Sequence, residues 1–410
     1  MIVAKPVMIE PRIVVFSSLF PSDVRPGAGI FIRERMFRVG RHLPIVVVSP
    51  VPWFPLQEVI RYWRPHFRLQ PARYEEQDGF QVFYPRFFSL PGLLKGLDGF
   101  FMALSCLPIF YKLKREFKFN IIDAHFAYPD GYAATLLGLW FKVPVTITLR
   151  GTEVPLSKMP ERKERMLTAL KRAAQVFTVA DSLKQHVASI GADPSKILVV
   201  GNGVDSEKFY PLEKTAARES LAISADAKIL VSVGGLVERK GFHRVIEVLP
   251  EIIKSHPNLI YLIVGGGGPE GNIRPQLEEQ VKNSGIEDNV RFLGPLPPEQ
   301  LKVPLSAADV FVLATANEGW ANVFLEAMAC GLPVITTDVG GNREVVCDQS
   351  LGEIVPFGES LALQQALLNA IEKNWDKSVI VEYARQNSWN KRVDVLVTEF
   401  NKLVGKKANS

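Results

Sequence analysis

The sequence predicts an α/β protein with two doubly wound domains, each a parallel sheet covered by helices on both faces. Short apolar runs rich in valine and isoleucine alternate with amphipathic stretches along the chain. Nearly continuous apolar strands are typical of parallel sheets that are buried on both faces. The chain has 410 residues, which corresponds to two domains at about 100–200 residues each.

Ten apolar runs mark the expected strands. In the first half they lie at 13–18, 44–49, 145–149, 176–180 and 197–200. In the second half they lie at 229–234, 259–265, 290–294, 310–314 and 333–337. The amphipathic stretches between them predict helices at 161–173, 181–190, 241–254, 270–284 and 360–373. Because strands and helices alternate in both halves, each half is expected to form its own sheet.

The boundary between the domains is expected near GNGVDSEKFYP, residues 201–211. Glycine, asparagine and aspartate followed by proline are typical of a connecting turn. We therefore predict a first domain at 1–205 and a second at 206–385. The last amphipathic stretch, within 386–410, is expected to be a helix that docks on one of the domains.

Composition and charge are those of a soluble globular chain, with 47% hydrophobic and 22% charged residues. The formal net charge of +5 is too small by itself to indicate a nucleic-acid partner. Residues 1–200 carry 27 Lys or Arg against 16 Asp or Glu, whereas residues 201–410 carry 21 against 27. This split predicts two halves that face different partners.

Cysteines and histidines predict no metal site. Cys106, Cys330 and Cys347 have no CxxC spacing, and the six histidines show no HxxxH pattern. An odd cysteine count fits a reduced compartment. The N-terminus lacks a signal-peptide layout, and the longest apolar run, Phe100 to Phe110, is too short to span a bilayer. We expect a cytoplasmic protein, either soluble or peripheral on the inner face of the membrane.

Residues 53–119 differ from the rest of the chain and are expected to be an insertion in the first domain. They hold 17 of the 40 aromatic residues, with 10 Lys or Arg against 6 Asp or Glu. In one interpretation, the rings and cations lie on an anionic membrane surface. In another, the aromatic side chains pack inside the first domain. Nucleic-acid binding is disfavoured, because no RNA-binding signature accompanies the basic charge.

Candidate ligand-binding residues in the first half follow the ends of predicted strands. In an open α/β sheet, ligands bind at the carboxyl ends of strands, beside free N–H groups at helix starts. Gly27 and Gly29 lie in such a loop and allow close approach of a phosphate or a sugar; an ordinary tight loop is the alternative. His125 ends another strand, with a structural histidine as the alternative. Arg150 and Glu153 lie just past a third, where the arginine holds either an anionic acceptor or a neighbouring carboxylate.

Two glycine loops in the second half are candidate phosphate sites. SVGGLVERKGF, residues 232–242, places Arg239 and Lys240 beside a glycine turn. The forked guanidinium of arginine and the compact ammonium of lysine both suit a diphosphate. IVGGGGPEGNIRPQLEEQ, residues 263–280, places four glycines between a strand and a helix. A solvated turn is the alternative for the first loop, and a tight strand-to-helix turn is the alternative for the second.

The stretch NEGWANVFLEAMACGLPVITT, residues 317–337, combines two carboxylates with a helix start. Residues 322–330 predict one short helix, with Asn322 as N-cap and Gly331 just past its end. Glu318 then lies in the preceding loop, and Glu326 lies in the second turn. The helix start offers free N–H groups to an anion, those of Ala321, Asn322 and Val323. This arrangement suits a nucleotide-sugar: hydroxyls at the two carboxylates and a diphosphate at the helix end.

Several stretches resemble the retaining GT-B glycosyltransferases of family 4. EGWANVFLEAMACGLPVITTDVGGNREVV is similar to the E-x7-E segment of that family, with Glu318 and Glu326 as its two glutamates. GNGVD and VRFLG…AADVFVL are similar to other family blocks. HFAYPDGYAA and FPSDVRPGAGIF resemble members that build bacterial surface polysaccharides, teichuronic-acid and exopolysaccharide transferases among them. The resemblance covers most of the chain and is strongest over residues 229–346.

The resemblance implies the GT-B fold, in which two Rossmann-like domains face each other across a cleft. The first domain would bind the acceptor, and the second would bind a UDP- or GDP-sugar donor. It further implies net retention at the anomeric carbon, no cofactor and no metal ion. The last helix would cross back to the first domain.

The resemblance also implies roles for single residues. Glu318 would orient the donor sugar, Glu326 would bind the ribose, and Lys240 and Arg239 would stabilise the leaving diphosphate. His125 would contact the donor sugar near the reacting centre. The further donor-binding positions are Gly235, Gly265, Arg291, Gly319, Ala321, Asn322 and Val323. The acceptor or phosphate loop comprises Gly27, Gly29 and Arg150.

One position departs from the family pattern. Many members carry an arginine directly after the first glycine of the block at 232–242, where this chain has Gly235. Arg239 is expected to supply that charge.

We therefore predict a retaining, metal-independent glycosyltransferase. It would move a sugar from a nucleotide-diphosphate sugar to a lipid-linked or polysaccharide acceptor in cell-surface polysaccharide synthesis. A nucleotide-sugar epimerase, or a phosphorylase with pyridoxal phosphate, is the first alternative on the same architecture. A non-catalytic binder of sugar nucleotides or of a lipid surface is the second, and the cleft glutamates and cations disfavour it.

Overall fold

The computed structural model describes residues 10–64, 67–268 and 270–408. Contacts divide the chain into two compact units. The first unit comprises Met1–Gly201 with Arg392–Ser410, and the second comprises Asn202–Lys391. The division after residue 201 falls four residues before the boundary predicted at 205.

The first unit is built on an eight-stranded sheet, parallel except for one edge strand. In sheet order the strands are β10 (Ile197–Val199), β9 (Gln175–Thr178), β8 (Val145–Leu149), β7 (Ile121–His125), β1 (Ile13–Phe16), β2 (Ile45–Val48), β5 (Phe80–Phe83) and β4 (Tyr74–Gln77). All residues of β1, β2, β7 and β8 are buried, as expected for strands with helices on both faces. The direction of winding changes between β1 and β7, which are adjacent in the sheet.

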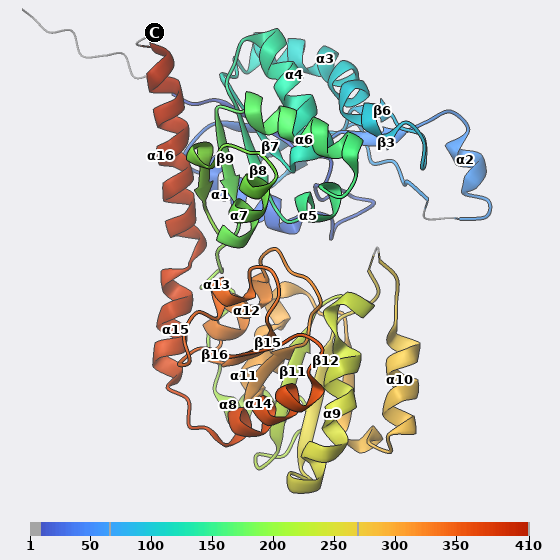
Figure 1. Ribbon diagram of the computed structural model, residues 1–410, viewed down its shortest axis with the longest axis vertical. Coiled ribbons are helices and arrows are strands. Elements are labelled where there is room, and N and C mark those ends of the chain that lie inside the picture. Colours follow the sequence, from blue (N-terminus) through green and yellow to red (C-terminus); the bar gives the residue numbers. More distant parts are fainter. Residues whose placement is uncertain (1–9, 65–66, 269, 409–410) are drawn as a thin grey trace, which may run out of the picture. The chain divides into compact units, whose positions relative to one another are not determined.

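Helices and a small second sheet complete the first unit. The helices are α1 (Ile30–Gly40), α2 (Gln57–Ile60), α3 (Asp98–Glu116), α4 (Tyr132–Phe141), α5 (Glu153–Leu156), α6 (Pro160–Arg172) and α7 (Asp181–Ser189). β3 (Val51–Trp53) and β6 (Arg86–Phe88) form a two-stranded parallel sheet. Figure 1 shows α2 on a projection that stands away from the main sheet of this unit.

The second unit contains a six-stranded sheet whose neighbouring strands all run parallel. In sheet order the strands are β13 (Val290–Gly294), β12 (Leu259–Val264), β11 (Lys228–Val233), β14 (Val310–Leu313), β15 (Val334–Thr337) and β16 (Gly352–Val355). Here the direction of winding changes between β11 and β14. Ligands of open α/β sheets bind outside the carboxyl ends of the strands at such a switch point.

The helices of the second unit pack in groups against its sheet. They are α8 (Lys214–Ser220), α9 (Phe242–Ser255), α10 (Arg274–Asn283), α11 (Lys302–Ala307), α12 (Asn322–Ala329), α13 (Asn342–Val345), α14 (Ser360–Glu372) and α15 (Lys377–Gln386). α9 packs against α10 and α14, α8 packs against α11, and α12 packs against α15. Together with the strands they enclose one extended hydrophobic core.

The predicted fold class is confirmed, since each unit is a doubly wound α/β sheet. All ten predicted strands are present, with ends that differ by one or two residues. The segment 53–119 contributes β4, β5 and α3 to the first unit. The last helix, α16 (Trp389–Ala408), buries Val393, Leu396, Phe400 and Val404 in the core of the first unit.

Candidate active site

An ion-paired cluster lies at the switch point of the second sheet. Arg239 and Lys240 follow β11, and Glu318 follows β14, so the loops of two adjacent strands meet there. Oε1 of Glu318 lies 2.5 Å from Nζ of Lys240 and 3.3 Å from Nη1 of Arg239. Thr315 Oγ1 donates to the same oxygen at 3.4 Å. The structure therefore brings together three of the four residues predicted to be catalytic.

Arg239 also pairs with a second carboxylate that the sequence analysis missed. Its Nε and Nη2 donate to Glu270 at 3.0 and 2.8 Å, while its Nη1 donates to the main-chain oxygen of Asn317 at 3.0 Å. The Glu270 carboxylate, followed by the charge of Glu318, raises the pKa of Arg239. Arg239 is thus held between two carboxylates, whereas the ion-pair partner of Lys240 among the described residues is Glu318.

Glycines allow these loops to approach one another closely. Gly241 has φ 77°, and a Cβ there would meet the Ala314 oxygen at 1.9 Å. Gly340 has φ 51°, and a Cβ there would meet the oxygen of Glu318 at 1.8 Å. Positive φ and close backbone approach both require glycine. The position of the Glu318 backbone is therefore set by contacts that tolerate no side chain.

The helix after Glu318 begins as predicted, but its cap differs. The N-cap residue is Ala321, and Asn322 is the first helical residue, so the prediction of Asn322 as N-cap is wrong. The Asn322 side-chain oxygen instead accepts a hydrogen bond from Asn202 at 2.9 Å. Asn202 belongs to the GNGVD stretch, and this contact links that stretch to the start of α12. Glu326 lies in the second turn, as expected, and is half-buried.

The remaining donor-binding predictions divide into two groups. Gly235 and Gly265 lie together, since a Cβ on Gly265 would meet the Gly234 oxygen at 1.8 Å and a Cβ on Gly235 would lie near Gly266. Gly319, Ala321 and Val323 lie on the loop and first turn that follow Glu318.

Arg291 does not lie at the carboxyl ends of the strands, where Lys240 and Glu318 meet. It is the second residue of β13, and its Nη1 donates to the oxygens of Leu221 and Ala222, in the turn between α8 and the start of β11. Its guanidinium therefore faces the amino ends of the strands, which corrects the prediction that it lines the donor site.

In the first unit, His125 lies in a buried charged network. His125 is the last residue of β7 and is fully buried. Its Nδ1 lies 3.1 Å from Nη2 and 3.3 Å from Nε of Arg150, and its Nε2 lies 3.5 Å from Oδ2 of Asp123. Because an arginine can only donate, Nδ1 is the acceptor and the ring proton is on Nε2. Nε2 is buried and has no hydrogen-bond partner among the described residues, so its 3.5 Å approach to Asp123 is not a hydrogen bond.

Burial controls the charges of this network. Burial, followed by the charges of Arg150 and Arg35, holds the pKa of His125 well below its usual range. Burial raises the pKa of Asp123 to about 6, although the hydrogen bond from Thr146 and the charge of Arg35 both lower it. Arg35 donates to the Val200 oxygen at 2.7 Å, and burial lowers its pKa to about 10. His125 is therefore neutral across the physiological range.

The structure also decides where the Glu153 carboxylate points. Glu153 is fully buried and accepts the main-chain N–H groups of Ala127 at 3.1 Å, Arg150 at 3.2 Å and Gly151 at 2.9 Å. It thereby fixes the loop that carries Arg150. The Arg150 guanidinium lies 4.9 Å from the centre of the Phe31 ring, at the start of α1.

Gly29 and Gly27 occupy different environments in the loop after β1. Gly29 has φ 68°, precedes α1, and its missing Cβ would lie 2.4 Å from the Leu19 oxygen. Gly27 is exposed, with nothing within 4 Å of its Cβ position. Asp130 holds the start of this loop, because its carboxylate accepts from the main-chain N–H and, at 3.0 Å, from the hydroxyl of Ser18. Burial raises the pKa of Asp130 to about 7.

Asp123, Asp130 and Glu270 were missed by the sequence analysis. Asp123 had a visible signal, because it lies two positions before His125 in a buried strand and so shares its face of the sheet. Among the described residues, no group of three or more His, Cys, Asp or Glu side chains is arranged to hold a metal ion.

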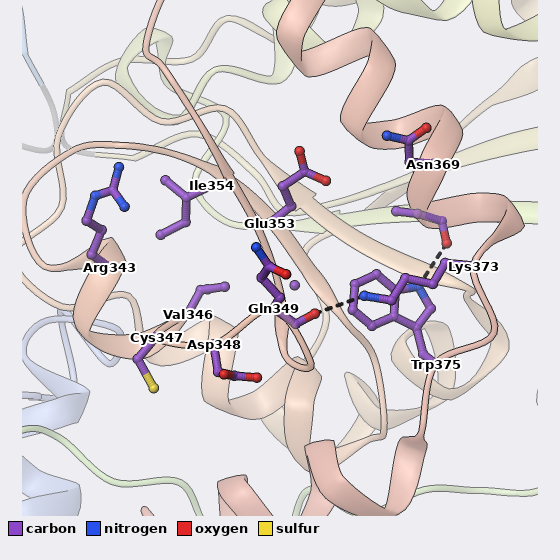
Figure 2. Close-up of a pocket in the computed structure, with 12 residues that line it drawn as sticks. Arg343, Val346, Cys347, Asp348, Gln349, Glu353, Ile354, Asn369, Lys373 and Trp375 are labelled. Carbon is purple, nitrogen blue, oxygen red and sulfur yellow. Dashed lines mark hydrogen bonds between the residues drawn. The ribbon is translucent and has the colours of Figure 1, made fainter.

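A separate cavity of about 510 Å³ lies at the edge strand of the second sheet (Figure 2). Its lining comes from α13, β16 and the end of α14. A dashed line in Figure 2 marks the hydrogen bond from Lys373 Nζ to the main-chain oxygen of Gln349. This bond is 2.9 Å long, and the Lys373 ammonium lies 3.8 Å from the centre of the Trp375 ring. The predicted site residues do not line this cavity, so it is distinct from the candidate site.

Comparison with protein families gives two matches that together cover most of the chain. The family described as glycosyl transferases group 1 matches residues 213–387, and glycosyltransferase family 4 matches residues 66–208. The first match contains the Arg239, Lys240 and Glu318 cluster, and the second contains His125 and Arg150.

Similar proteins agree with these matches, and a solved structure shares the fold. The chain is 29% identical to a glycosyltransferase of Bacillus subtilis (strain 168) assigned provisionally to teichuronic acid biosynthesis, over 80% of this chain and 82% of that protein. It is 31% identical to a D-inositol 3-phosphate glycosyltransferase of Geodermatophilus obscurus, over 69% of this chain and 66% of that protein. The solved structure of Anabaena HepE in complex with UDP matches with a TM-score of 0.70 at 18% identity, covering 97% of this chain and 99% of that one.

Proposed function

Because the chain belongs to the glycosyl transferases of group 1, we propose that it is a retaining glycosyltransferase that uses a UDP- or GDP-sugar. The acceptor is a lipid-linked or polysaccharide glycan in cell-surface polysaccharide synthesis, met at the cytoplasmic face of the membrane. Similarity to a provisionally assigned teichuronic acid glycosyltransferase supports this class of acceptor. Structural similarity to a protein solved with UDP supports the class of donor.

The observation that carries the proposal is the contact of Lys240 and Arg239 with one oxygen of Glu318 at the switch point. In the absence of donor, the carboxylate neutralises both cations. A diphosphate that enters the site competes for these cations, because it carries more charge and offers more acceptor oxygens. The Glu318 carboxylate is then released to accept hydrogen bonds from the sugar hydroxyls.

The same cations then serve the reaction. As the bond between the anomeric carbon and the phosphate oxygen breaks, negative charge grows on the diphosphate, and Lys240 and Arg239 stabilise it. The acceptor hydroxyl attacks from the side of the leaving group, and its proton passes to a phosphate oxygen. The new glycosidic bond therefore keeps the configuration of the donor, and no metal ion is required for charge stabilisation.

The first unit supplies a neutral histidine and an arginine for the acceptor side of this proposal. Since Nδ1 of His125 accepts from the Arg150 guanidinium, His125 holds that guanidinium in place. Arg150 is the half-buried member of the pair and is proposed to hold an anionic group of the acceptor. His125 is thereby a positioning residue for Arg150, and its contact with the donor sugar stays a prediction.

The proposal is tested by incubating the purified full chain with UDP-, GDP- and ADP-sugars and a glycolipid extract. Release of the nucleoside diphosphate is measured with and without the extract, and NMR of the product reports the anomeric configuration. Acceptor-dependent release with retention is expected. Conversion of the donor without acceptor identifies an epimerase, and binding without turnover identifies a non-catalytic binder; both results overturn the proposal.

A further inference from the structure

An exposed apolar stripe runs along one face of α3. It consists of Leu97, just before the helix, and Phe100, Leu104 and Tyr111 within it. These positions are separated by three, four and seven residues, so they share one helical face. Leu104 is 48% exposed and Tyr111 is 66% exposed. At a rise of about 1.5 Å per residue, the stripe is about 21 Å long.

The opposite face of α3 is anchored in the core of the first unit. Met102, Cys106 and Phe110 are fully buried. The Phe110 ring packs edge-on against Phe16 and Phe119, with centroids 5.9 and 5.4 Å apart. Among the described residues, Lys95–Glu116 is the stretch apolar and long enough to cross a membrane by length and composition. A spanning position would pull its anchored face out of this core, so α3 offers a membrane only its outer side.

Further exposed apolar residues lie just before the stripe in the chain and on α4, which packs against α3. Leu93 and Leu94 lie exposed just before it in the chain. On the other side, α4 packs against α3, and the Tyr111 ring lies 5.0 Å from the ring of Phe141 at the end of α4. Leu139 and Trp140, next to Phe141, are also exposed. We name these eight residues the α3 patch: Leu93, Leu94, Leu97, Phe100, Leu104, Tyr111, Leu139 and Trp140. Exposed apolar side chains gathered on one helix face and on the segments next to it mark an interaction site, unlike scattered single residues.

One end of the α3 patch is basic. Residues 112–118 contain four Lys or Arg and one acidic residue, Glu116. Glu116 pairs with Arg115 at 3.0 Å and with Lys112 at 4.0 Å, and Asp98, at the other end of α3, pairs with Lys95 at 3.0 Å. The carboxylates of α3 are therefore already matched by cations, and the basic end is left in excess. This charge favours an anionic partner over a second copy of the same patch.

We propose that the α3 patch docks on an anionic bilayer, with α3 in the plane of the membrane. Its apolar side chains enter the boundary between headgroups and acyl chains, and the basic end lies against lipid phosphates. An aromatic ring with a polar tip, as in Tyr111 and Trp140, suits this depth. The α3 patch would be the surface at which the protein meets a lipid-linked acceptor. The identity of that acceptor rests on the proposed function, whereas docking on the bilayer does not.

The test is co-sedimentation of the full chain with vesicles of phosphatidylcholine, alone or mixed with phosphatidylglycerol, at low and high salt. Binding to the anionic vesicles is expected, with loss at high salt. Leu104→Glu is expected to weaken it at least about tenfold, since it places a carboxylate in the apolar boundary. Leu361→Glu, at a leucine 79% exposed on α14 of the second unit, is the matched control and leaves binding unchanged. Arg115→Glu is expected to weaken binding to anionic vesicles alone.

Unfolding is excluded by requiring that each variant keep the melting temperature of the parent. Phe100→Ser replaces Leu104→Glu if that variant fails this requirement. Absence of binding to anionic vesicles at low salt, or equal binding by the Leu104→Glu and Leu361→Glu variants, overturns the proposal. A dimer in sedimentation equilibrium that Leu104→Glu dissociates, with vesicle binding unchanged, assigns the patch to a second copy and also overturns it. Vesicle binding without sugar transfer leaves this inference standing and removes the proposed function alone.

Discussion

The ammonium group of Lys240 lies 2.5 Å from Oε1 of Glu318, although 77 residues separate them in the chain. The contact forms because β11 and β14 are neighbours in the second sheet, and each residue follows the carboxyl end of one of them. Both side chains are mostly buried, so the pair is shielded from solvent more than a surface ion pair. A ligand that displaces this contact must replace it with an anion.

Replacing Glu318 with glutamine is expected to remove most of the turnover while the fold is kept. The amide preserves the shape of the side chain but removes its negative charge. That charge pairs with Lys240 and Arg239 and strengthens the hydrogen bonds that the carboxylate accepts from the sugar hydroxyls. We expect kcat/KM to fall on the order of 10²-fold, as for loss of one group that orients the transition state. Steady-state release of nucleoside diphosphate measures this loss.

Glu270→Gln is the matched control for Glu318→Gln, since Glu270 also pairs with Arg239 but is half exposed. We expect a decrease well below that of Glu318→Gln. Near-normal activity of the Glu318→Gln variant would remove Glu318 from the account.

Lys240→Met is expected to weaken binding of the nucleoside diphosphate and to slow transfer. The methionine side chain fills a similar volume but cannot stabilise charge on the leaving group. We expect at least about a tenfold loss in diphosphate affinity, which corresponds to about 1.4 kcal/mol. Calorimetric titration with UDP and GDP measures it. Lys254→Met, on an exposed lysine paired with Glu251, is the control and should bind as the parent does.

The two glycines of the loop after β1 are expected to respond differently to alanine. Gly29→Ala places a Cβ in the left-handed backbone conformation and close to the Leu19 oxygen. The left-handed conformation alone lowers the free energy of unfolding by about 1–2 kcal/mol. Gly27→Ala meets no neighbour and should change stability by less than about 0.5 kcal/mol. Denaturant unfolding measures both, and an equal effect of the two changes would show that the loop is not held as described.

Asp130 is expected to make stability fall as pH rises from about 4 to about 7. Its pKa is raised by burial to about 7, while in the unfolded chain it is near its ordinary value of about 3.9. Between these values the native state keeps the proton and the unfolded chain has released it, so this contribution is lost at about 1.4 kcal/mol per pH unit. The contribution is present in full below pH 4 and absent above pH 7.

Asp130→Asn isolates this contribution, because the amide has no proton to lose in this range. The difference in unfolding free energy between parent and variant should change steadily between pH 4 and pH 7 and stay constant above. Urea unfolding at several pH values measures it. A difference independent of pH would mean that Asp130 is ionised in the folded protein.

Strand positions were predictable where burial left a strong pattern. β1, β2 and β8 are continuous runs of buried residues, mostly β-branched, so their sequences are typical of a parallel sheet. β4 is different: its sequence YEEQ contains two glutamates and lies at the antiparallel edge of the sheet, half exposed. Because an edge strand needs little apolar surface, its sequence does not separate it from a polar loop.

The sequence indicates the positions of single site residues better than it indicates the contacts between them. Glu318 and Lys240 each follow a strand, which the sequence indicates, but their contact depends on the order of strands in the sheet. The contact of His125 with Arg150 depends on β7 and β8 being neighbours, which the chain order alone does not establish. The position of Arg291 was not predictable from the sequence block that contains it. The direction of its side chain depends on its hydrogen bond to the turn after α8.

The central claim, that the Lys240 and Glu318 loops form a donor site, is tested most directly by calorimetric titration with UDP-, GDP- and ADP-sugars. The account predicts that UDP- or GDP-sugars bind, and that both Lys240→Met and Glu326→Ala weaken binding at least about tenfold. Failure of the parent chain to bind any of these sugars, with and without anionic vesicles, would contradict the account. Unchanged binding by both variants would contradict it equally, because the donor would then be held elsewhere.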